Sequence, residues 1–206
     1  MSSSGQVLRE LSGRGLLLIQ DKNLPSVVGI ITGESLRGSW WAHPQGKLIF
    51  SVLSEVVEHP DVLVTKLLSG KATLVHRALW PALLSVVSTA QVWQLGGLSA
   101  PARRLLERVS DGGIVRASGP VAKELAARLL VNTSQEHTAS GKHVNALESW
   151  QAWASRVGCR YESSYPIALQ VIEEAARALG APLSALPWQS RGGKRLPAPR
   201  PTRGKA

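Results

Sequence analysis

Two adjacent tryptophans near the start of the chain have the chemistry to hold a flat ligand. Trp40 and Trp41 follow Ser39 and precede His43-Pro44. Neighbouring side chains point in different directions, so two adjacent indoles cannot easily both lie in a core. One of them could line a pocket and stack on a nucleobase, because every base has a flat face that an indole can cover. Alternatively, both indoles pack in a seam between two domains.

A second group follows further along the chain, where His76 and Arg77 precede Trp80. On a helix, His76 and Trp80 are four residues apart and share one face. Lys66 and Lys71 stand shortly before them on a predicted hairpin, so this segment could grip phosphate groups. An equally good interpretation is a solvated hairpin followed by a histidine that caps the next helix.

Two further histidines, His137 and His143, flank a polar turn. They could share a metal ion, but the chain has no evident third ligand, and we expect neither a metal nor another cofactor. No serine elbow, zincin helix or paired-carboxylate motif is present, so no catalytic residue is assigned. The pocket candidates are Trp40, Trp41, His43, His76, Arg77, Trp80, His137 and His143.

Positive charge is concentrated at the C-terminal end. The sequence has 24 Lys and Arg against 14 Asp and Glu, a formal net charge of +10. Residues 191–206 hold six of these cations, three prolines and no acid, which predicts a disordered basic tail over 189–206. Such a tail is an electrostatic anchor for a polyanion, with DNA as the expected partner, or else a solubilising appendage. The nucleic-acid-binding candidates are Lys66, Lys71, Arg77, Lys142, Arg191, Lys194 and Arg195.

Composition excludes several classes of protein. Apolar residues make up 44% of the 206 residues, which excludes a wholly disordered chain. The one cysteine, Cys159, excludes a disulfide framework and fits a reducing cytoplasm. No apolar run approaches the roughly 20 residues that span a bilayer, and the N-terminus lacks the pattern of a signal peptide. We therefore expect a cytoplasmic protein with no membrane contact.

Apolar periodicity predicts a helical first half with one hairpin. Pro44 suits the first turn of a helix whose apolar positions then recur every four residues as far as Pro60. Beyond Pro60, β-branched residues and the turn Ser69-Gly70-Lys71 predict a hairpin. The predicted elements are helices over 6–20, 24–31, 44–58 and 76–87 and a hairpin over 62–75.

The second half has the order helix, strand, helix and two-stranded wing, which is typical of a winged-helix domain. The first half looks like a degraded copy of it. The sequence therefore predicts an α+β, mostly helical fold of tandem winged-helix-like units with short β-hairpin wings. The predicted elements here are helices over 100–110, 119–130, 145–157 and 166–179 and strands over 113–117, 130–133 and 137–144.

Gly96-Gly97 marks the predicted boundary between the two units. The predicted domains are a helical, winged-helix-like domain over 1–95 and a second winged-helix domain over 96–160. A C-terminal helix over 161–188 is expected to pack on the core, and the tail over 189–206 follows it.

A series of short motifs runs from the first half into the second. It comprises Ser39-Trp40-Trp41-Ala42-His43-Pro44, His59-Pro60-Asp61-Val62-Leu63, Gly70-Lys71-Ala72-Thr73-Leu74-Val75-His76-Arg77-Ala78-Leu79-Trp80-Pro81, Leu129-Leu130-Val131, His137-Thr138, Gly141-Lys142-His143 and Leu147-Glu148-Ser149-Trp150. Over roughly residues 35–155, this series resembles a bacterial family of AlkZ-related proteins, which are distant relatives of the AlkZ winged-helix DNA glycosylases.

The resemblance implies a tandem winged-helix fold and a connection with DNA repair. The AlkZ glycosylases remove alkylated or crosslinked bases by hydrolysing the glycosidic bond, and they carry a Gln-x-Gln catalytic motif. Gln91 and Gln94 stand one residue too far apart to match that motif. Catalysis is therefore not carried over by the resemblance.

Three functions remain open at this point. The first is DNA binding, with recognition of damaged or alkylated DNA. The second is an active DNA glycosylase, which must flip its base into a pocket and place a water at the sugar carbon. The third is a winged-helix protein-interaction or regulatory domain that binds no nucleic acid. A continuous positive surface would favour duplex binding, and its candidate members are Arg103, Arg104, Arg108, Lys123 and Arg128.

Overall fold

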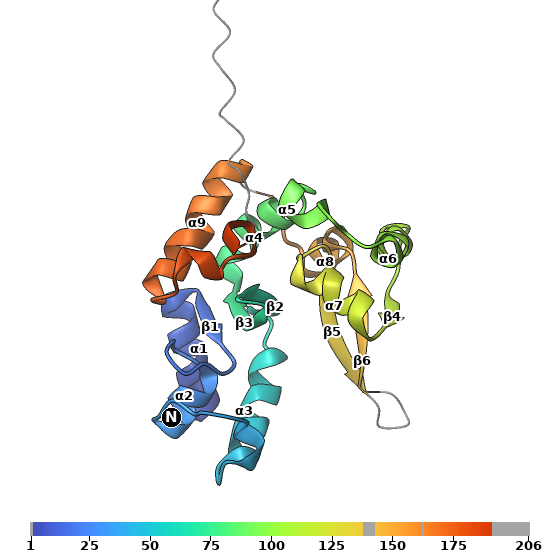
Figure 1. Cartoon of the computed structure of the whole chain (residues 1–206). Helices are drawn as coiled ribbons and strands as arrows, with labels where there is room; N and C mark the ends of the chain where they lie inside the picture. Colours follow the sequence, from blue (N-terminus) through green and yellow to red (C-terminus); the bar gives the residue numbers. More distant parts are fainter. Residues whose placement is uncertain (1, 138–142, 162, 191–206) are drawn as a thin grey trace, which may run out of the picture.

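The computed structural model describes residues 2–137, 143–161 and 163–190. In this part of the chain the fold is α+β, with mostly short helices around two separate three-stranded antiparallel sheets. Figure 1 shows one sheet beside the N-terminal helices and the other, formed by β4, β5 and β6, on the opposite side of the molecule. No helix of the described residues is long and apolar enough to cross a bilayer.

The first sheet has the strand order β1-β3-β2, with β1 brought in from the start of the chain. Leu16 of β1 pairs with Val75 of β3, and Leu63 of β2 pairs with the same residue from the other side. The elements of this half are α1 (Ser3–Arg14), β1 (Leu16–Leu18), α2 (Val27–Thr32), the 3-10 turn η1 (Trp40–Ala42), α3 (Gly46–Val57), β2 (Val62–Leu68) and β3 (Lys71–His76).

The predicted helix over 6–20 is wrong beyond Arg14. Gly15 adopts a left-handed conformation with φ 75°, which ends α1, and its amide donates to the Leu11 carbonyl. The next three leucines, Leu16–Leu18, are fully buried and form β1. An all-apolar run of three residues has no helical or strand period of its own, so its partner strand decides its conformation.

The hairpin predicted over 62–75 is confirmed. Ser69 and Gly70 both have positive φ, 50° and 67°, which is the backbone geometry of the tight turns that suit a two-residue hairpin loop. The Ser69 amide donates to the Ala185 carbonyl at 2.7 Å, so the C-terminal segment holds this turn in place.

The second sheet has the strand order β4-β6-β5. Thr133 of β5 and Val115 of β4 both pair with Leu147 of β6, so β6 is the central strand. The elements of this half are η2 (Arg77–Leu79), α4 (Trp80–Val87), α5 (Val92–Leu95), α6 (Ala100–Ser110), β4 (Val115–Ala117), α7 (Pro120–Ala127), β5 (Asn132–His137), β6 (His143–Glu148) and α8 (Trp150–Val157).

The predicted boundaries of this second hairpin need correction. The strands span 132–137 and 143–148 rather than 130–133 and 137–144, and the helix that follows begins at Trp150 rather than at residue 145. Ser149 sets that start, because its hydroxyl accepts from the Ala152 amide at 3.1 Å. The helix predicted over 119–130 ends at Ala127, shortly before Leu129 takes a φ of 50°.

The last long helix, α9 (Tyr165–Ala178), packs against α4. Its buried positions are Ala168, Ile172 and Ala176, and the two alanines allow a close approach of the two helices. The prediction of a helix over 166–179 is thus confirmed. After α9, η3 (Leu183–Ala185) and α10 (Pro187–Ser190) bring Trp188 to within 5.8 Å of Trp93, between ring centroids.

Buried apolar side chains form two clusters. The smaller cluster lies between α6, α7 and the second sheet and includes Leu105, Leu125 and Leu147. The larger cluster extends from α1 to Trp188. It also takes in Trp150 and Trp153, which stand within the predicted 96–160 domain, and Trp153 meets Trp80 edge-on at 5.2 Å.

A buried glutamine connects α4 and α5 with a residue that follows α7. Gln94 is fully buried, and its amide donates to the carbonyls of Val87 at 2.9 Å and Leu129 at 3.3 Å. Its own carbonyl accepts from the Gln91 amide at 3.0 Å. The Leu129 carbonyl also accepts from the Trp150 indole at 2.8 Å, so this one carbonyl accepts hydrogen bonds from side chains of both α5 and α8.

We predict that Gln94→Leu lowers the free energy of unfolding by about 2–4 kcal/mol. The substitution keeps most of the side-chain volume but leaves the Val87 carbonyl and the Gln91 amide without these partners in a buried place. Urea denaturation followed by circular dichroism measures the change. The matched control is Gln151→Leu, an exposed position on α8, and an equal loss in both variants would contradict the role given to Gln94.

Candidate nucleic-acid interface

The first predicted group forms an exposed aromatic stack at the start of α3. Trp40 and Trp41 lie in η1 with their rings stacked, 4.1 Å between centroids and 23° between planes. Phe50, one turn into α3, lies 5.6 Å from Trp41. Trp41 is 64% exposed and Phe50 51% exposed, whereas Trp40 is partly buried against the larger cluster.

Gly46 allows this stack to sit so close to α3. A Cβ atom at Gly46 would lie 3.1 Å from the Trp41 carbonyl oxygen and 3.3 Å from that of Trp40, which is tighter than most real contacts. His43 closes the turn, because its Nδ1 accepts from the Gln45 amide at 3.2 Å. Its Nε2 lies 3.5 Å from a carboxylate oxygen of Glu34, and both features hold the segment against α3.

The second predicted group has a structural role. His76 Nδ1 accepts from the Ala78 amide at 3.3 Å and so caps η2, as the alternative interpretation supposed. Trp80 is buried, and its indole donates to the Val75 carbonyl at 3.1 Å. The Arg77 guanidinium lies 5.8 Å from the Trp80 ring and 2.9 Å from the Asp61 carboxylate.

The structure does not bring these two groups together around one cavity. Trp40 and Trp41 precede the first turn of α3, and the Arg77–Asp61 pair follows its last turn. Twelve residues of α-helix span about 18 Å, so the groups lie at opposite ends of α3. His137 and His143 are directly paired across β5 and β6, but their side chains fall outside the described part of the chain.

Two of the predicted hairpin cations are already neutralised. Lys71 Nζ lies 2.6 Å from an Asp21 carboxylate oxygen, and Arg77 pairs with Asp61. Lys66 on β2 is exposed and forms no ion pair with any described residue. The other nucleic-acid candidates lie outside the described residues: Lys142, Arg191, Lys194 and Arg195.

Asp21 is the most strongly held carboxylate of this region. Burial alone would raise its pKa, but the hydrogen bond from Lys71 and those from the amides of Asn23 and Leu24 together lower the pKa below the ordinary 3.8. The ion pair therefore persists at neutral pH and ties the turn after β1 to the start of β3.

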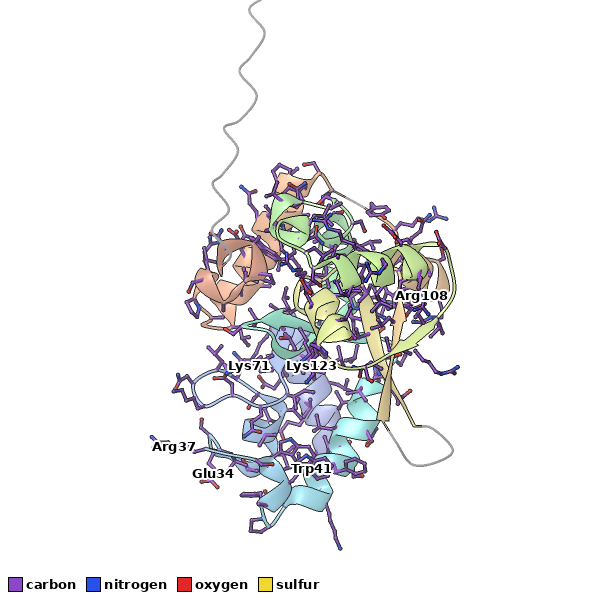
Figure 2. All side chains as sticks on the ribbon, turned by 45° about the vertical axis from the view of Figure 1, so that its right-hand side comes forward. Glu34, Arg37, Trp41, Lys71, Arg108 and Lys123 are labelled. Carbon is purple, nitrogen blue, oxygen red and sulfur yellow. The ribbon has the colours of Figure 1, made fainter. Side chains whose placement is uncertain are left out.

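A larger set of solvent-exposed cationic side chains lies on α6 and α7. Arg104 and Arg108 are one turn apart on α6 and exposed, as is Lys123 on α7 (Figure 2). Arg103 is exposed too, and its Nε donates to the Leu98 carbonyl at 3.3 Å.

Arg128 does not belong to this surface, contrary to its place in the predicted set. Its guanidinium donates to the carbonyls of Gln94 at 2.8 Å and Gly96 at 2.7 Å, and its Nε lies 3.6 Å from Glu124. Arg128 therefore holds the loop after α5 in place through hydrogen bonds to its backbone carbonyls.

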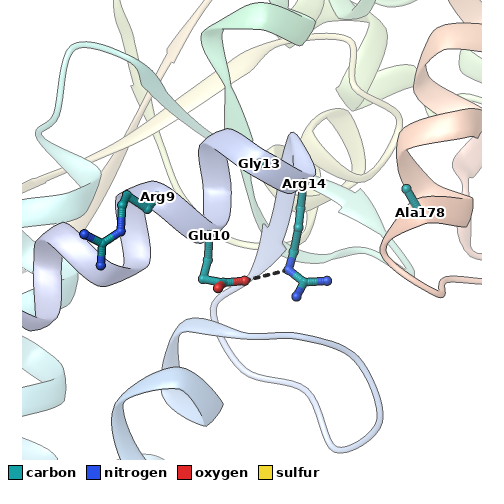
Figure 3. A pocket seen from close by; sticks show the side chains of 5 residues that line it. All are labelled: Arg9, Glu10, Gly13, Arg14 and Ala178. Carbon is teal, nitrogen blue, oxygen red and sulfur yellow. Dashed lines mark hydrogen bonds and ion pairs between the residues drawn. The ribbon is translucent and has the colours of Figure 1, made fainter.

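Neither of two hollows in the described part of the chain is lined by a tryptophan or a histidine. The first, about 400 Å³, lies between α1 and α9, where Arg14 Nε and Glu10 form an ion pair at 2.8 Å (Figure 3). The second, about 370 Å³, is lined by Gln20, Asp21, Lys22, Leu36, Arg37, Gly38 and Lys71. No group of three His, Cys, Asp or Glu side chains that could hold a metal ion occurs in the described ranges.

The second hollow collects residues that the sequence analysis did not group. Lys22 and Arg37 stand in two loops, and Lys71 comes from the start of β3, about 50 residues after Asp21 in the chain. No spacing in the sequence signals such a set, because only the pairing of β1 with β3 brings these loops together. Comparisons with family models, with curated proteins and with solved structures find no match to the chain.

We predict that Asp21→Asn reduces stability by about 1–2 kcal/mol at pH 7 and by progressively less as the pH falls below the ordinary carboxyl pKa of 3.8. A carboxylate whose pKa is lowered by folding stabilises the fold above its unfolded pKa, and this contribution is lost as the pH falls through the folded pKa. Urea melts at a series of pH values from 2 to 7 test this. A difference between the two proteins that stays constant over this range would show that the charge of Asp21 is not responsible.

Proposed function

We propose that the chain is a cytoplasmic DNA-binding protein made of two winged-helix units that contact a distorted or damaged duplex. The order of the elements supports the fold. In the first half, α1, β1, α2, α3 and the β2–β3 hairpin follow one another, and the strand order is β1-β3-β2. This is the order of a helix-turn-helix followed by a wing, in which the first strand joins the edge of the hairpin.

The second half repeats this plan with one helix fewer. α6, β4, α7 and the β5–β6 hairpin follow in order, and the strand order β4-β6-β5 corresponds strand by strand to that of the first sheet. The motifs that resemble the AlkZ-related proteins extend over both halves. We infer that the two halves are related units, and that the second has kept a single helix between its first strand and its wing.

The balance of exposed charge in the second half is the observation that carries the proposal. Residues 96–160 contain nine Lys and Arg against five Asp and Glu. Two of those acids are held inside the unit: Glu124 accepts from the Ser99 hydroxyl at 2.7 Å, and Glu148 accepts from Asn132 at 2.8 Å and pairs with Arg156. Glu107 and Asp111 remain as exposed acids beside the exposed cations Arg103, Arg104, Arg108 and Lys123, so this surface of α6 and α7 keeps a net positive charge, which suits contact with phosphates.

Base excision is not included in the proposal. A glycosylase needs an enclosed site where a flipped base meets a residue that orients a water. The Gln91–Gln94 pair, which stands nearest to a Gln-x-Gln pattern, forms a capping box at the start of α5, and Gln94 is buried in hydrogen bonds to backbone carbonyls. Both amides bond to the backbone, and the Gln94 side chain is fully buried.

We predict that the triple variant Arg104→Gln, Arg108→Gln and Lys123→Gln binds duplex DNA at least tenfold more weakly at low salt. Each lost phosphate contact lowers the slope of log affinity against log salt by about 0.9, so three contacts lower it by about 3. Fluorescence anisotropy with a labelled 20-base-pair duplex, intact or with one abasic site, measures both quantities. Tighter binding of the abasic duplex is expected for a protein that engages distorted DNA.

The matched control removes three positive charges from the other end of the molecule, as Lys22→Gln, Arg37→Gln and Lys47→Gln. This control keeps the affinity for the intact duplex if α6 and α7 form the binding surface. Equal losses in the two triple variants would mean that only net charge matters. An absence of binding by the unmodified protein at low salt would overturn the proposal and favour a protein-interaction domain.

A further inference from the structure

We propose that the aromatic stack before α3 and the cationic hollow behind it form a binding site for an unpaired stretch of DNA. This inference shares with the proposed function only the class of ligand. It assigns a second surface, at the end of the first unit that lies away from α6. Figure 2 shows Glu34, Arg37 and Trp41 at this end and Arg108 toward the other.

Exposure of the aromatic stack is the first observation. Five of the seven tryptophans are buried, whereas Trp41 keeps 64% of its surface open, although Trp40 and Phe50 lie against it. Leu48 is also exposed, at 43%. A pre-stacked pair of indoles is a rigid platform, so a nucleobase can stack on it without the cost of ordering a mobile side chain.

The hollow supplies the charge that a backbone of phosphates requires. Lys22 and Arg37 line it beside the Lys71–Asp21 ion pair, which carries no net charge and in which Asp21 also accepts from two backbone amides. Neither Lys22 nor Arg37 forms an ion pair within the described ranges, and both are exposed.

The hollow and the stack are parts of one surface. The Gln20 side-chain amide donates to the Gly38 carbonyl, and Gly38 lines the hollow just before the chain enters η1 at Trp40. On the far side of the stack, Lys47 in the first turn of α3 is exposed and unpaired among the described residues. Positive charge therefore flanks the aromatic rings on both sides along the chain.

This combination favours an unpaired strand over the alternatives. A duplex keeps its bases inside the stack, where an exposed indole cannot reach their faces, whereas a single strand offers both bases and phosphates. A stable protein contact buries about 800 Å² on each partner and draws on many more than four apolar side chains. The exposed Glu34 carboxylate lies beside this surface, 3.5 Å from His43 Nε2.

Anisotropy of a labelled 12-residue oligothymidine with the full chain tests the proposal. We expect Trp41→Ala to weaken binding about tenfold or more and Phe50→Ala to weaken it several-fold, since stacking of one base on one ring contributes that much. The triple variant of Lys22, Arg37 and Lys47 to Gln should weaken binding and lower the salt slope by about 2, as expected for three contacts with a single strand.

Two controls keep this test separate from that of the proposed function. Tyr161→Ala removes another exposed aromatic ring and should leave the affinity for oligothymidine unchanged. The variant of Arg104, Arg108 and Lys123 should lose duplex affinity but keep oligothymidine affinity. Thermal melts of each variant establish that folding is retained, which the exposure of these side chains favours.

Each outcome decides between the two proposals. Oligothymidine binding that depends on Trp41, in a protein that binds no duplex, would support this site and overturn the proposed function. Duplex binding together with equal oligothymidine affinity for the unmodified protein and Trp41→Ala would overturn this site alone. Self-association in sedimentation that Trp41→Ala abolishes, without any effect on oligothymidine, would also overturn it and identify the stack as a contact between copies of the chain.

Discussion

One backbone carbonyl, that of Leu129, holds the two halves of this protein together. It accepts a hydrogen bond from Gln94, at the junction between α4 and α6, and another from the Trp150 indole at the start of α8. Leu129 itself has a positive φ, so the chain turns sharply there and directs the carbonyl inward. Because unpaired polar groups in a dry interior cost free energy, each of these partners depends on the others. The two halves also meet where Trp80 contacts Trp153 and where α7 and β5 pack against β2.

The tryptophans differ in how their indole N–H groups are used. Trp93, Trp150 and Trp188 use their indole N–H groups inside the fold, toward Tyr165, Leu129 and Glu173 respectively. Burial raises the pKa of the Tyr165 hydroxyl, although the hydrogen bond from Trp93 opposes this, so the phenol stays neutral and accepts that bond. Trp41 is exposed and Trp40 is half-buried, and within the described part of the chain neither indole donates such a bond. Aromatic residues therefore contribute both to the core of this protein and to its exposed surface.

Charged side chains are likewise divided, into those that form ion pairs and those that remain exposed. Buried or half-buried acids pair with more exposed cations, as in Asp21 with Lys71, Asp61 with Arg77 and Glu148 with Arg156, and the first of these pairs joins segments 50 residues apart. Two groups of exposed cations without an ion pair in the described ranges lie on α6 and α7 and around η1. We propose that the surface of α6 and α7 binds a duplex and that the surface around η1 binds an unpaired strand. A junction between duplex and unpaired DNA contains both features, as does a duplex with a displaced base.

Local patterns in the sequence were sufficient for most elements. The helices α6 and α9 and the β2–β3 hairpin were predictable because their apolar period and their turn residues agree. Leu16–Leu18 was not, because a run of three leucines carries no period, and its strand conformation depends on β3, more than fifty residues away. The positions of Trp80 and Arg128 were likewise beyond local inference. Their amphipathic side chains suit a surface or an interior equally well, and only packing places one against Trp153 and the other against the carbonyls of Gln94 and Gly96.

By itself the sequence determined the α+β class, the β2–β3 hairpin and the excess of positive charge, since these depend on residue type and short spacing. Tertiary structure decided which of the singled-out residues meet. It placed the Trp40–Trp41 pair and the His76–Arg77 pair at opposite ends of α3, and it neutralised Lys71 with Asp21. It also assembled a cationic hollow from Lys22, Arg37 and Lys71. The physical reason is that contacts between distant segments depend on how strands pair and helices pack, and no local period in the chain records that choice.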